Sequence, residues 1–296
     1  MELVLTLVSP DADLAGAAAD RARSALAGAG AAVKAPKPLG AGAFDLPLIA
    51  DPAVAAPLLQ AAVEDLAVDY CLQPAAGRRK RLLIADMDST IINVECIDEL
   101  ADFAGVKAQV SEITERAMRG ELDFEGALKE RVAMLKGLPL ADLQRAYDER
   151  VRLNPGARTL VRTMTAHGAK AFLVSGGFNF FTSRVAAAAG FDANRANTLI
   201  AAGDVLAGTV GEPILGREAK LAALKEEAAS LGVPLSATLA VGDGANDLAM
   251  IEASGLGVAY RAKPIVAAQA DAKVDHADLT ALLYFQGYRA DEFVVD

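Results

Sequence analysis

The segment Arg81-Leu-Leu-Ile-Ala-Asp-Met-Asp-Ser-Thr90 indicates the fold: a continuous apolar run ends in two carboxylates. Two later segments, Ala171–Ser175 and Thr238–Asp243, have the same form, and a fourth apolar run covers Gly255–Tyr260. Runs that are apolar throughout, rather than alternating, are typical of parallel strands covered by helices on both faces. We therefore predict an α/β fold built on a doubly wound parallel sheet.

Helices are expected between these strands. One follows Gly177 and is closed by Gly190, another covers Arg217–Leu231, and a third runs into Glu252. The interval between the first two strands is far longer than one crossover helix needs. It predicts an inserted helical cap, at about 95–153, with helices at Ile97–Ala104, Glu112–Arg119, Phe124–Leu135 and Ala141–Glu149. Glycines and a proline within 197–214 predict a β-hairpin.

Residues 1–78 are expected to form a separate small α/β domain, and residues 79–296 the domain that carries the cap. The predicted order is βαββαβ, as in ferredoxin-like sandwiches. The first helix, Leu14–Ala27, has Asp13 as its expected N-cap. The remaining segments are strands at 3–8, 31–34, 44–50 and 68–72 and a helix at 53–66. This pattern resembles small amino-acid-binding regulatory (ACT-like) domains. The sequence leaves open whether residues 1–78 bind a ligand.

Composition excludes several classes of protein. Of 296 residues, 53 % are hydrophobic, so the chain can bury a sizeable core and is not disordered. A net charge of −10 argues against a nucleic-acid partner, which requires a basic face. No apolar stretch approaches the roughly 18 residues that a membrane span needs. The two cysteines, Cys71 and Cys96, are expected to be buried free thiols, which fits a cytoplasmic location.

Carboxylates follow two of the predicted strands. Asp86 and Asp88 come after the first strand, and Asp243 and Asp247 come after the third. Because the carboxyl ends of parallel strands meet at one sheet edge, these groups are expected to share a site. Several carboxylates in one cleft require a cation, and Mg²⁺ prefers such oxygen ligands. Taken singly, each pair also fits an ordinary turn or helix cap.

Two further positions complete a phosphate-handling set. Ser175 and Gly176, at a predicted helix start, form a potential anion cradle, although a simple N-cap explains them as well. Taken alone, Lys220 is expected to be a surface lysine, although the predicted β-hairpin nearby could direct its side chain toward the cleft. Together the residues imply phosphoryl transfer, with Asp86 as nucleophile and Asp88 as general acid and base. Ser175, the Gly176 amide and Lys220 would then hold the phosphoryl oxygens.

These motifs together resemble the haloacid dehalogenase-like phosphatases and, within them, the phosphoserine phosphatases. The resemblance is carried by Asp86-Met-Asp-Ser-Thr-Ile-Ile-Asn-Val-Glu-Cys-Ile-Asp-Glu-Leu100, Ala117-Met-Arg-Gly-Glu-Leu-Asp-Phe124, Arg131-Val-Ala-Met-Leu-Lys-Gly137, Ser175-Gly-Gly177, Lys220 and Gly242-Asp-Gly-Ala-Asn-Asp247. It covers roughly Arg81 to Leu283 and leaves the N-terminal unit outside.

The resemblance implies roles that the spacing alone does not. Glu95 would meet the ammonium group of the substrate and Arg131 its carboxylate, while Met118 and Phe124 would line the closed pocket. Asp243 would complete the metal site with Asp86 and the backbone carbonyl of Asp88. In addition, the resemblance implies that Asn246 contacts substrate or phosphate and that Asp247 orients neighbours such as Lys220.

The implied activity is the Mg²⁺-dependent hydrolysis of O-phospho-L-serine through an aspartyl-phosphate, the last step of L-serine biosynthesis. The implied partner is this small phosphomonoester, and homodimerisation is compatible with the sequence. Three alternatives stay open. The enzyme could pass phosphate to another alcohol such as homoserine, the chain could be a regulatory amino-acid-binding protein with a disused phosphatase fold, or it could hydrolyse carbon–halogen bonds, which would leave Asp88 unexplained.

Overall fold

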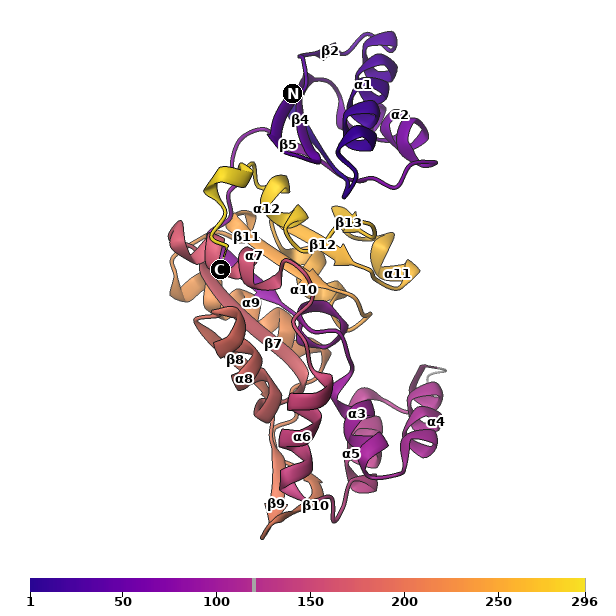
Figure 1. Ribbon diagram of the computed structural model, residues 1–296, viewed down its shortest axis with the longest axis vertical. Coiled ribbons are helices and arrows are strands. Elements are labelled where there is room, and N and C mark those ends of the chain that lie inside the picture. The colour runs from indigo at the N-terminus through magenta and orange to yellow at the C-terminus, as the bar shows by residue number, and fades with distance from the viewer. Residues whose placement is uncertain (119–120, 296) are drawn as a thin grey trace.

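The structure, a computed structural model, describes residues 1–118 and 121–295, without the side chain of Met118. Its centre is a parallel sheet in the order β13-β12-β11-β6-β7-β8 (Figure 1). The strands are β6 (Leu82–Ala85), β7 (Lys170–Phe178), β8 (Ala193–Asn197), β11 (Thr238–Gly242), β12 (Leu256–Tyr260) and β13 (Ala272–Val274). The predicted parallel sheet is confirmed. Its two edge strands, β8 and β13, were not predicted, because neither is a continuous apolar run.

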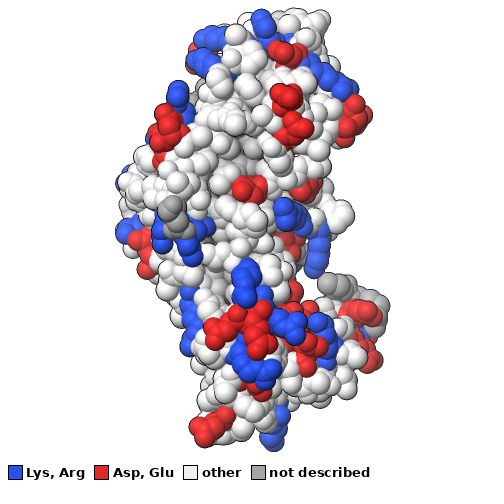
Figure 2. Space-filling view, viewed as in Figure 1, with Lys and Arg blue, Asp and Glu red and all other residues white. Residues whose placement is uncertain are grey.

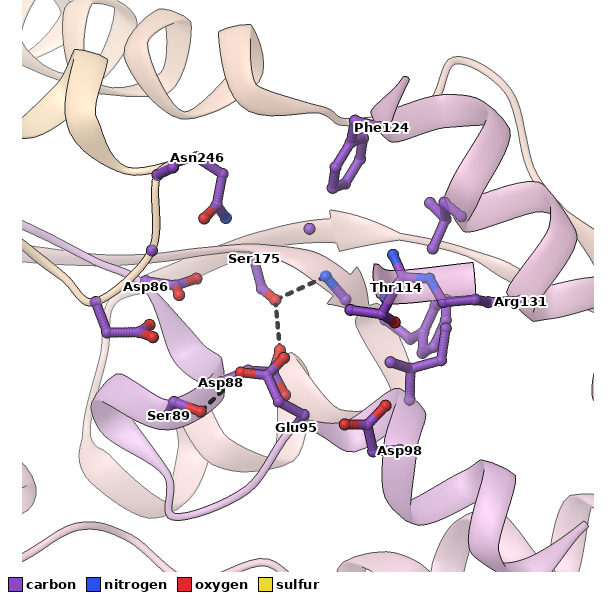
Figure 3. Close-up of a pocket in the computed structure, with 18 of the residues that line it drawn as sticks. Asp86, Asp88, Ser89, Glu95, Asp98, Thr114, Phe124, Arg131, Ser175 and Asn246 are labelled. Atoms are coloured by element: carbon purple, nitrogen blue, oxygen red, sulfur yellow. Dashed lines mark hydrogen bonds between the residues drawn. The ribbon is translucent and has the colours of Figure 1, made fainter. Parts of the chain in front are cut away.

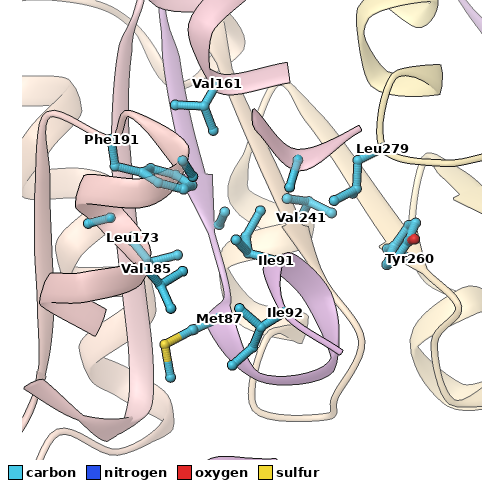
Figure 4. Packing of buried hydrophobic residues seen from close by; sticks show 14 of the residues in the cluster. Met87, Ile91, Ile92, Val161, Leu173, Val185, Phe191, Val241, Tyr260 and Leu279 are labelled. Carbon is cyan, nitrogen blue, oxygen red and sulfur yellow. The ribbon is translucent and has the colours of Figure 1, made fainter. Parts of the chain in front are cut away.

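Helices cover both faces of this sheet, as expected for a doubly wound fold. Leu83 and Ala85 of β6 pack toward α7 (Ala157–Ala166), α8 (Asn179–Ala189) and α12 (Ala281–Phe285). Figure 4 shows part of this cluster, with Val161 and Val185 around the sheet. Leu82 and Ile84 point to the other face, where α9 (Arg217–Ser230), α10 (Leu248–Ala253) and α11 (Pro264–Ala267) cover them.

The N-terminal elements form a second, antiparallel sheet in the order β2-β4-β1-β5, with β3 paired to β4. They are β1 (Glu2–Val8), α1 (Ala12–Gly28), β2 (Ala32–Val33), β3 (Lys37–Gly40), β4 (Ala43–Ile49), α2 (Pro52–Val63) and β5 (Asp69–Pro74). The predicted elements are present, and β3, a short strand containing Pro38, is additional. The N-cap prediction was wrong: the carboxylate of Asp11 accepts from the amides of Asp13 and Leu14, so Asp13 lies in the first turn.

The face of the N-terminal sheet that its helices leave open packs against the C-terminal part of the chain. Asp69, which is buried, accepts hydrogen bonds from the backbone amides of residues 275–277. Arg78 binds the carboxylate of Asp45 at 2.6 and 2.9 Å and also the carbonyl oxygen of Phe285. These polar contacts hold the N-terminal elements beside α12 and β13 (Figure 1).

In the described part of the chain, four cap helices lie between β6 and α7, as predicted, although the second begins at Lys107 rather than Glu112, and its predicted end at Arg119 lies outside the described residues. They are α3 (Cys96–Phe103), α4 (Lys107–Met118), α5 (Phe124–Met134) and α6 (Leu140–Arg150). The expected hairpin is also present, formed by β9 (Leu199–Ala202) and β10 (Val205–Val210). The backbone amide of Gly137, after α5, donates to the carbonyl of Leu206, which ties the hairpin to the cap.

Charged side chains of both signs are intermingled over the cap helices (Figure 2). Arg145 pairs with Asp142 and Glu149 on α6, and Arg150 pairs with residues of α3. Cys71 and Cys96 are free and buried, as predicted. Within the ranges described, no helix combines the length and the apolar character that crossing a bilayer would demand.

Candidate active site

The loop that follows β6 brings two carboxylates to the edge of the sheet. Asp86 is extended, and a single irregular turn, Met87–Ile91, comes directly after it. The side chain of Met87 enters the core, while Asp86 and Asp88 lie beside the pocket (Figure 3). Both carboxylates are largely buried, at 5 % and 9 % exposure. Burial of two acidic groups is costly unless partners compensate, so their contacts define the site.

Lys220 connects the loops that follow β6 and β11. Its ammonium lies 2.6 Å from a carboxylate oxygen of Asp86 and 2.6 Å from one of Asp247, and only 2 % of the side chain is exposed. Burial alone would lower the pKa of Lys220, but the charges of Asp247 and Asp86 outweigh it and raise the pKa. Asp247 can approach because residue 242 is glycine: a Cβ there would lie 2.4 Å from the Asp247 carboxyl carbon.

Three carboxylates are placed to hold a cation. Oxygens of Asp86, Asp243 and Asp247 lie within 4.8 Å of one another. Burial, and then the charge of Asp247, raise the pKa of Asp243 to about 6 and that of Asp86 well above its usual range. Lys220 supplies one positive charge against these three carboxylates, so the donor set fits a hard divalent cation. The carboxylate of Asp88, in contrast, lies outside this cluster.

Asp88 is held by groups from two other segments. One oxygen accepts from the backbone amide of Cys96 at 2.8 Å, and the other accepts from the Ser175 hydroxyl at 3.0 Å. The Ser175 oxygen in turn accepts from the amide of Gly177 at 2.8 Å. Burial raises the pKa of Asp88, and the hydrogen bonds from Cys96 and Ser175 offset only part of this rise. Asp88 thus differs from Asp86 in its partners, which are an amide and a hydroxyl rather than the ammonium group of Lys220.

The prediction that Ser175 and Gly176 stand at a helix start was wrong. Strand β7 continues through both residues to Phe178, and α8 begins only at Asn179. Two consecutive glycines usually end a strand, but here the parallel pairing to β8 resumes at Phe178 after an irregularity that follows Val174. Both Ser175 and Gly176 nevertheless line the pocket, because the strand ends beside it.

Two opposite charges from the cap face the same pocket. Glu95, at the N-terminus of α3, accepts a hydrogen bond of 2.7 Å from the Ser89 hydroxyl. The carboxylate of Glu95 is exposed to solvent within the pocket. Partial burial by the surrounding protein, and then the charge of Asp88, nevertheless raise its pKa to about 7. Arg131, on α5, donates to the carbonyl of Ala127, and burial lowers the pKa of its guanidinium.

The pocket between cap and sheet has a volume of about 510 Å³. Of the predicted residues, it is lined by Asp86, Asp88, Glu95, Phe124, Arg131, Ser175, Gly176, Asp243 and Asn246. Lys220 and Asp247 contact Asp86 or Asp243 without being part of the lining. The side chain of Met118 is outside the described part of the chain. The Phe124 ring lies against Gly176 and Gly216, where added Cβ atoms would be 3.0 and 3.2 Å from it.

Sequence reasoning missed several neighbours of these groups. The hydroxyl of Thr90 donates to Asp243 at 3.2 Å, and Ser89 contacts Glu95; both belong to the motif after β6 but received no role. Lys263 lines the pocket, and its amide donates to the carbonyl of Asp243. The sequence signal that could have identified Lys263 is its position just beyond the fourth apolar strand. Asp98 and Thr114 also line the pocket, but they lie on cap helices, where the sequence offers no comparable signal.

Comparisons with known proteins agree with this geometry. Residues 83–252 match the family model described as haloacid dehalogenase-like hydrolase. A phosphoserine phosphatase of Streptococcus thermophilus is 49 % identical over 200 residues, which cover 68 % of this chain and 93 % of that protein. Among solved structures, a hydrolase of the same family from Salmonella enterica superposes with a TM-score of 0.82 at 29 % identity, covering 96 % of this chain and 98 % of its own.

A structure described as a phospho-aspartyl intermediate analogue of phosphoserine phosphatase has a TM-score of 0.65 and 38 % identity, covering 70 % of this chain and 99 % of its own. The family match includes β6, the whole cap, β7, α9 and β11, the segments that carry the acidic cluster and Lys220. By sequence and by fold, this chain belongs to the haloacid dehalogenase-like hydrolase family.

Proposed function

We propose that this protein hydrolyses O-phospho-L-serine to L-serine and phosphate through an aspartyl-phosphate at Asp86. One observation carries the proposal. The pocket has the carboxyl pair Asp86 and Asp88 at the sheet and the charged pair Glu95 and Arg131 at the cap. The first pair suits a phosphoryl group, and the second matches the ammonium and carboxylate of an amino acid. The relatives named phosphoserine phosphatase support the same substrate.

The first step is attack by Asp86. Lys220 binds one of its oxygens, which leaves the other to form a bond to phosphorus while the bond from phosphorus to the serine oxygen breaks. The leaving alkoxide needs a proton, and we assign its delivery to Asp88, whose pKa is also raised and whose carboxyl group is not bound by Lys220. Serine then departs, and Asp86 carries the phosphoryl group as an acyl phosphate.

The second step reverses the role of Asp88. Now ionised, it takes a proton from a water molecule that attacks phosphorus, and the bond between phosphorus and the Asp86 oxygen breaks. Phosphate and the free Asp86 carboxylate result, so the enzyme returns to its starting state. The hydrogen bond from the backbone amide of Cys96 keeps Asp88 in place through both steps.

Phosphoryl oxygens would be held by donors around Asp86. We assign this role to Ser175, the amide of Gly176, Lys220 and Asn246. Ser175 now donates to Asp88, and its hydroxyl can turn to a phosphoryl oxygen when substrate enters. Asp247 orients Lys220, and its second oxygen fixes the loop amides of Asp243 and Gly244.

A divalent cation, which we propose to be Mg²⁺, would be held by Asp86, Asp243 and the backbone carbonyl of Asp88. When bound, it offsets the repulsion between the Asp86 carboxylate and the phosphate dianion. Asp247 shares the acidic cluster, but its oxygens already accept from Lys220 and two amides. Thr90 keeps Asp243 turned toward the cluster.

The amino-acid part of the substrate would lie under the cap. Glu95 would bind its ammonium, and Arg131 its carboxylate. Phe124 and Met118 would exclude water, and the contact of the Phe124 ring with Gly176 and Gly216 supports this role for the ring.

We also propose the division into an N-terminal domain, residues 1–78, and a phosphatase domain, residues 79–296, with the cap at about 95–153. The separate hydrophobic cluster around Leu5, Ala18 and Leu46 supports it. Homodimerisation and a cytoplasmic location stay predictions from the sequence.

The test is phosphate release from O-phospho-L-serine with Mg²⁺, with and without a chelator, for wild type and Asp86→Asn. We expect equal amounts of serine and phosphate from wild type, loss of release with chelator, and no turnover by Asp86→Asn. Equal rates for the two proteins would refute the proposal. A shortfall of phosphate when homoserine is added would instead reveal transfer to an alcohol.

A further inference from the structure

Ser89 has an unfavourable backbone conformation at the centre of the site. Its φ is +56°, and among the described non-glycine residues only Arg261 shares a positive φ. L-residues adopt this left-handed region rarely, and glycine adopts it freely. A side chain retained here indicates that its hydroxyl contributes something that glycine would not.

The Ser89 hydroxyl has a specific partner. It donates to a carboxylate oxygen of Glu95 at 2.7 Å, and both residues line the pocket (Figure 3). Glu95 is the N-cap of α3, where a carboxylate commonly accepts from the first helical amides, yet it makes no such bond. The serine therefore draws the carboxylate away from its own helix and into the pocket.

The backbone fixes this arrangement. The amide of Ser89 donates to the carbonyl of Val94, which closes the loop between the two residues. The amide of Cys96, next to Glu95, donates to Asp88, next to Ser89. With both ends of the loop tied, the left-handed turn at Ser89 sets where its hydroxyl meets Glu95.

We propose that Ser89 is a positioning residue that holds Glu95 for an ammonium group, and so sets the preference for amino-acid phosphomonoesters. The inference rests on the proposed function, because it assigns Glu95 to the ammonium. Ser89 itself needs no contact with the substrate: one oxygen of Glu95 accepts the serine hydrogen bond, and the other stays available to the ligand.

The test compares two esters that differ at one group: O-phospho-L-serine, and 3-phosphoglycerate, which has a hydroxyl where phosphoserine has the ammonium. The measured quantity is the ratio of their kcat/KM values. Ser89→Gly removes the hydroxyl and relaxes the backbone. We expect the ratio to fall roughly tenfold, mainly through KM for phosphoserine, as for loss of a hydrogen bond to a charged group.

Three further variants make the result specific. Ser89→Ala should lower the ratio similarly, since it also lacks the hydroxyl. Arg261→Gly relaxes the other positive φ, at a residue that is not part of the pocket lining, and should keep the wild-type ratio. In a Glu95→Gln background, Ser89→Gly should change the ratio little, because the two residues act as one unit.

The possible failures are distinguishable. If wild type does not prefer phosphoserine over 3-phosphoglycerate, the proposed function fails and the role of Ser89 fails with it. If wild type shows the preference and Ser89→Gly retains it, only the Ser89 proposal is overturned. An equal loss in the wild-type and Glu95→Gln backgrounds would also overturn it, because Ser89 would then act independently of Glu95.

Discussion

Asp86 and Asp88 stand two residues apart, and their surroundings suit them to different tasks. Burial and the charge of Asp247 raise the pKa of Asp86 well above its usual range, and the ammonium of Lys220, which binds Asp86 directly, offsets part of this rise. Asp88 has a hydroxyl and an amide as partners, and burial raises its pKa. Two neighbouring carboxyl groups with different partners can serve as nucleophile and proton donor in one reaction.

Glu95 gives a pH dependence at the residue scale. Its pKa of about 7 means that the carboxylate is mostly protonated below neutral pH and ionised above it. An ammonium binds the ionised form, so kcat/KM for phosphoserine should rise with pH through this range. Below the pKa the ionised fraction falls roughly tenfold per pH unit.

The measurement is the ratio of kcat/KM for phosphoserine to that for 3-phosphoglycerate, between about pH 6 and about pH 8. Taking the ratio cancels the titration of the phosphate group. Glu95→Gln, which cannot ionise, should give a low ratio that does not change with pH. A wild-type ratio that falls as pH rises would contradict the assignment of Glu95.

Asp243, a proposed metal ligand, gives a prediction for stability. Its folded-state pKa of about 6 exceeds that of an unfolded aspartate, so its stabilising contribution is present at low pH and is lost as pH rises through about 6. The Tm of the metal-free protein should fall over this range, and less steeply in Asp243→Asn. At neutral pH, Mg²⁺ at a hundredfold excess over Kd should add about 2.7 kcal/mol, or roughly 5 °C. Thermal unfolding tests this, and an equal Mg²⁺ effect on Asp243→Asn would contradict the role.

At the scale of elements, α5 meets the sheet through one aromatic ring. The Phe124 ring lies against Gly216, the N-cap of α9, and Gly216→Ala would place a Cβ 3.2 Å from it. The backbone at Gly216 is extended and accepts alanine, so the fold should tolerate the change. We expect kcat/KM to fall on the order of a few-fold, because the cap would close a few tenths of an ångström short. Steady-state kinetics measures this.

Gly28→Ala is the matched control. Gly28 ends α1, and a Cβ there would meet no atom within 4 Å. It should keep wild-type kinetics. Unchanged kinetics in Gly216→Ala as well would show that the contact between Phe124 and Gly216 does not matter for turnover.

Local patterns predicted most of these elements. Buried parallel strands such as β6 and β11 are recognisable because nearly every position in them is apolar, and cap helices α3 and α5 are recognisable by the glycines that follow them. Edge strand β8 escaped prediction, because its residues are half-exposed and polar. Strand β7 ends later than predicted, since its pairing to β8 is interrupted after Val174 but resumes at Phe178, beyond the two glycines that usually mark a turn.

Contacts between distant segments were harder to predict. By sequence alone, Lys220 resembles an ordinary surface residue of a helix. In the fold, that helix, α9, packs behind β6, and Lys220 binds two carboxylates. Arg131 and Glu95 face one pocket only because α3 and α5 fold over the strand ends. Family resemblance supplied these roles. Ser89 and Thr90 were within the quoted motif, but nothing local identifies Glu95 and Asp243 as their partners.

At the scale of the whole molecule, the N-terminal elements are fixed to the rest of the chain by buried polar contacts. Arg78 and Asp45 form an ion pair with 13 % and 11 % of their side chains exposed. Asp45→Ala would leave the guanidinium without its partner and should destabilise the protein by about 3 kcal/mol. Asp65→Ala breaks a solvent-exposed pair with Arg21 and should destabilise the protein far less. Chemical denaturation compares them, and equal losses would contradict this account.

The molecule as a whole brings α9 and the loops after β6 and β11 together around Asp86, the proposed nucleophile. Trapping the covalent intermediate tests this most directly. Wild-type enzyme would be mixed with O-phospho-L-serine, quenched in acid and reduced with borohydride, which converts an aspartyl-phosphate to homoserine, and its peptides would be analysed by mass spectrometry. The account predicts homoserine at position 86 and nowhere else, dependent on substrate. Turnover with Asp86 unmodified, or with the label on another residue, would contradict it.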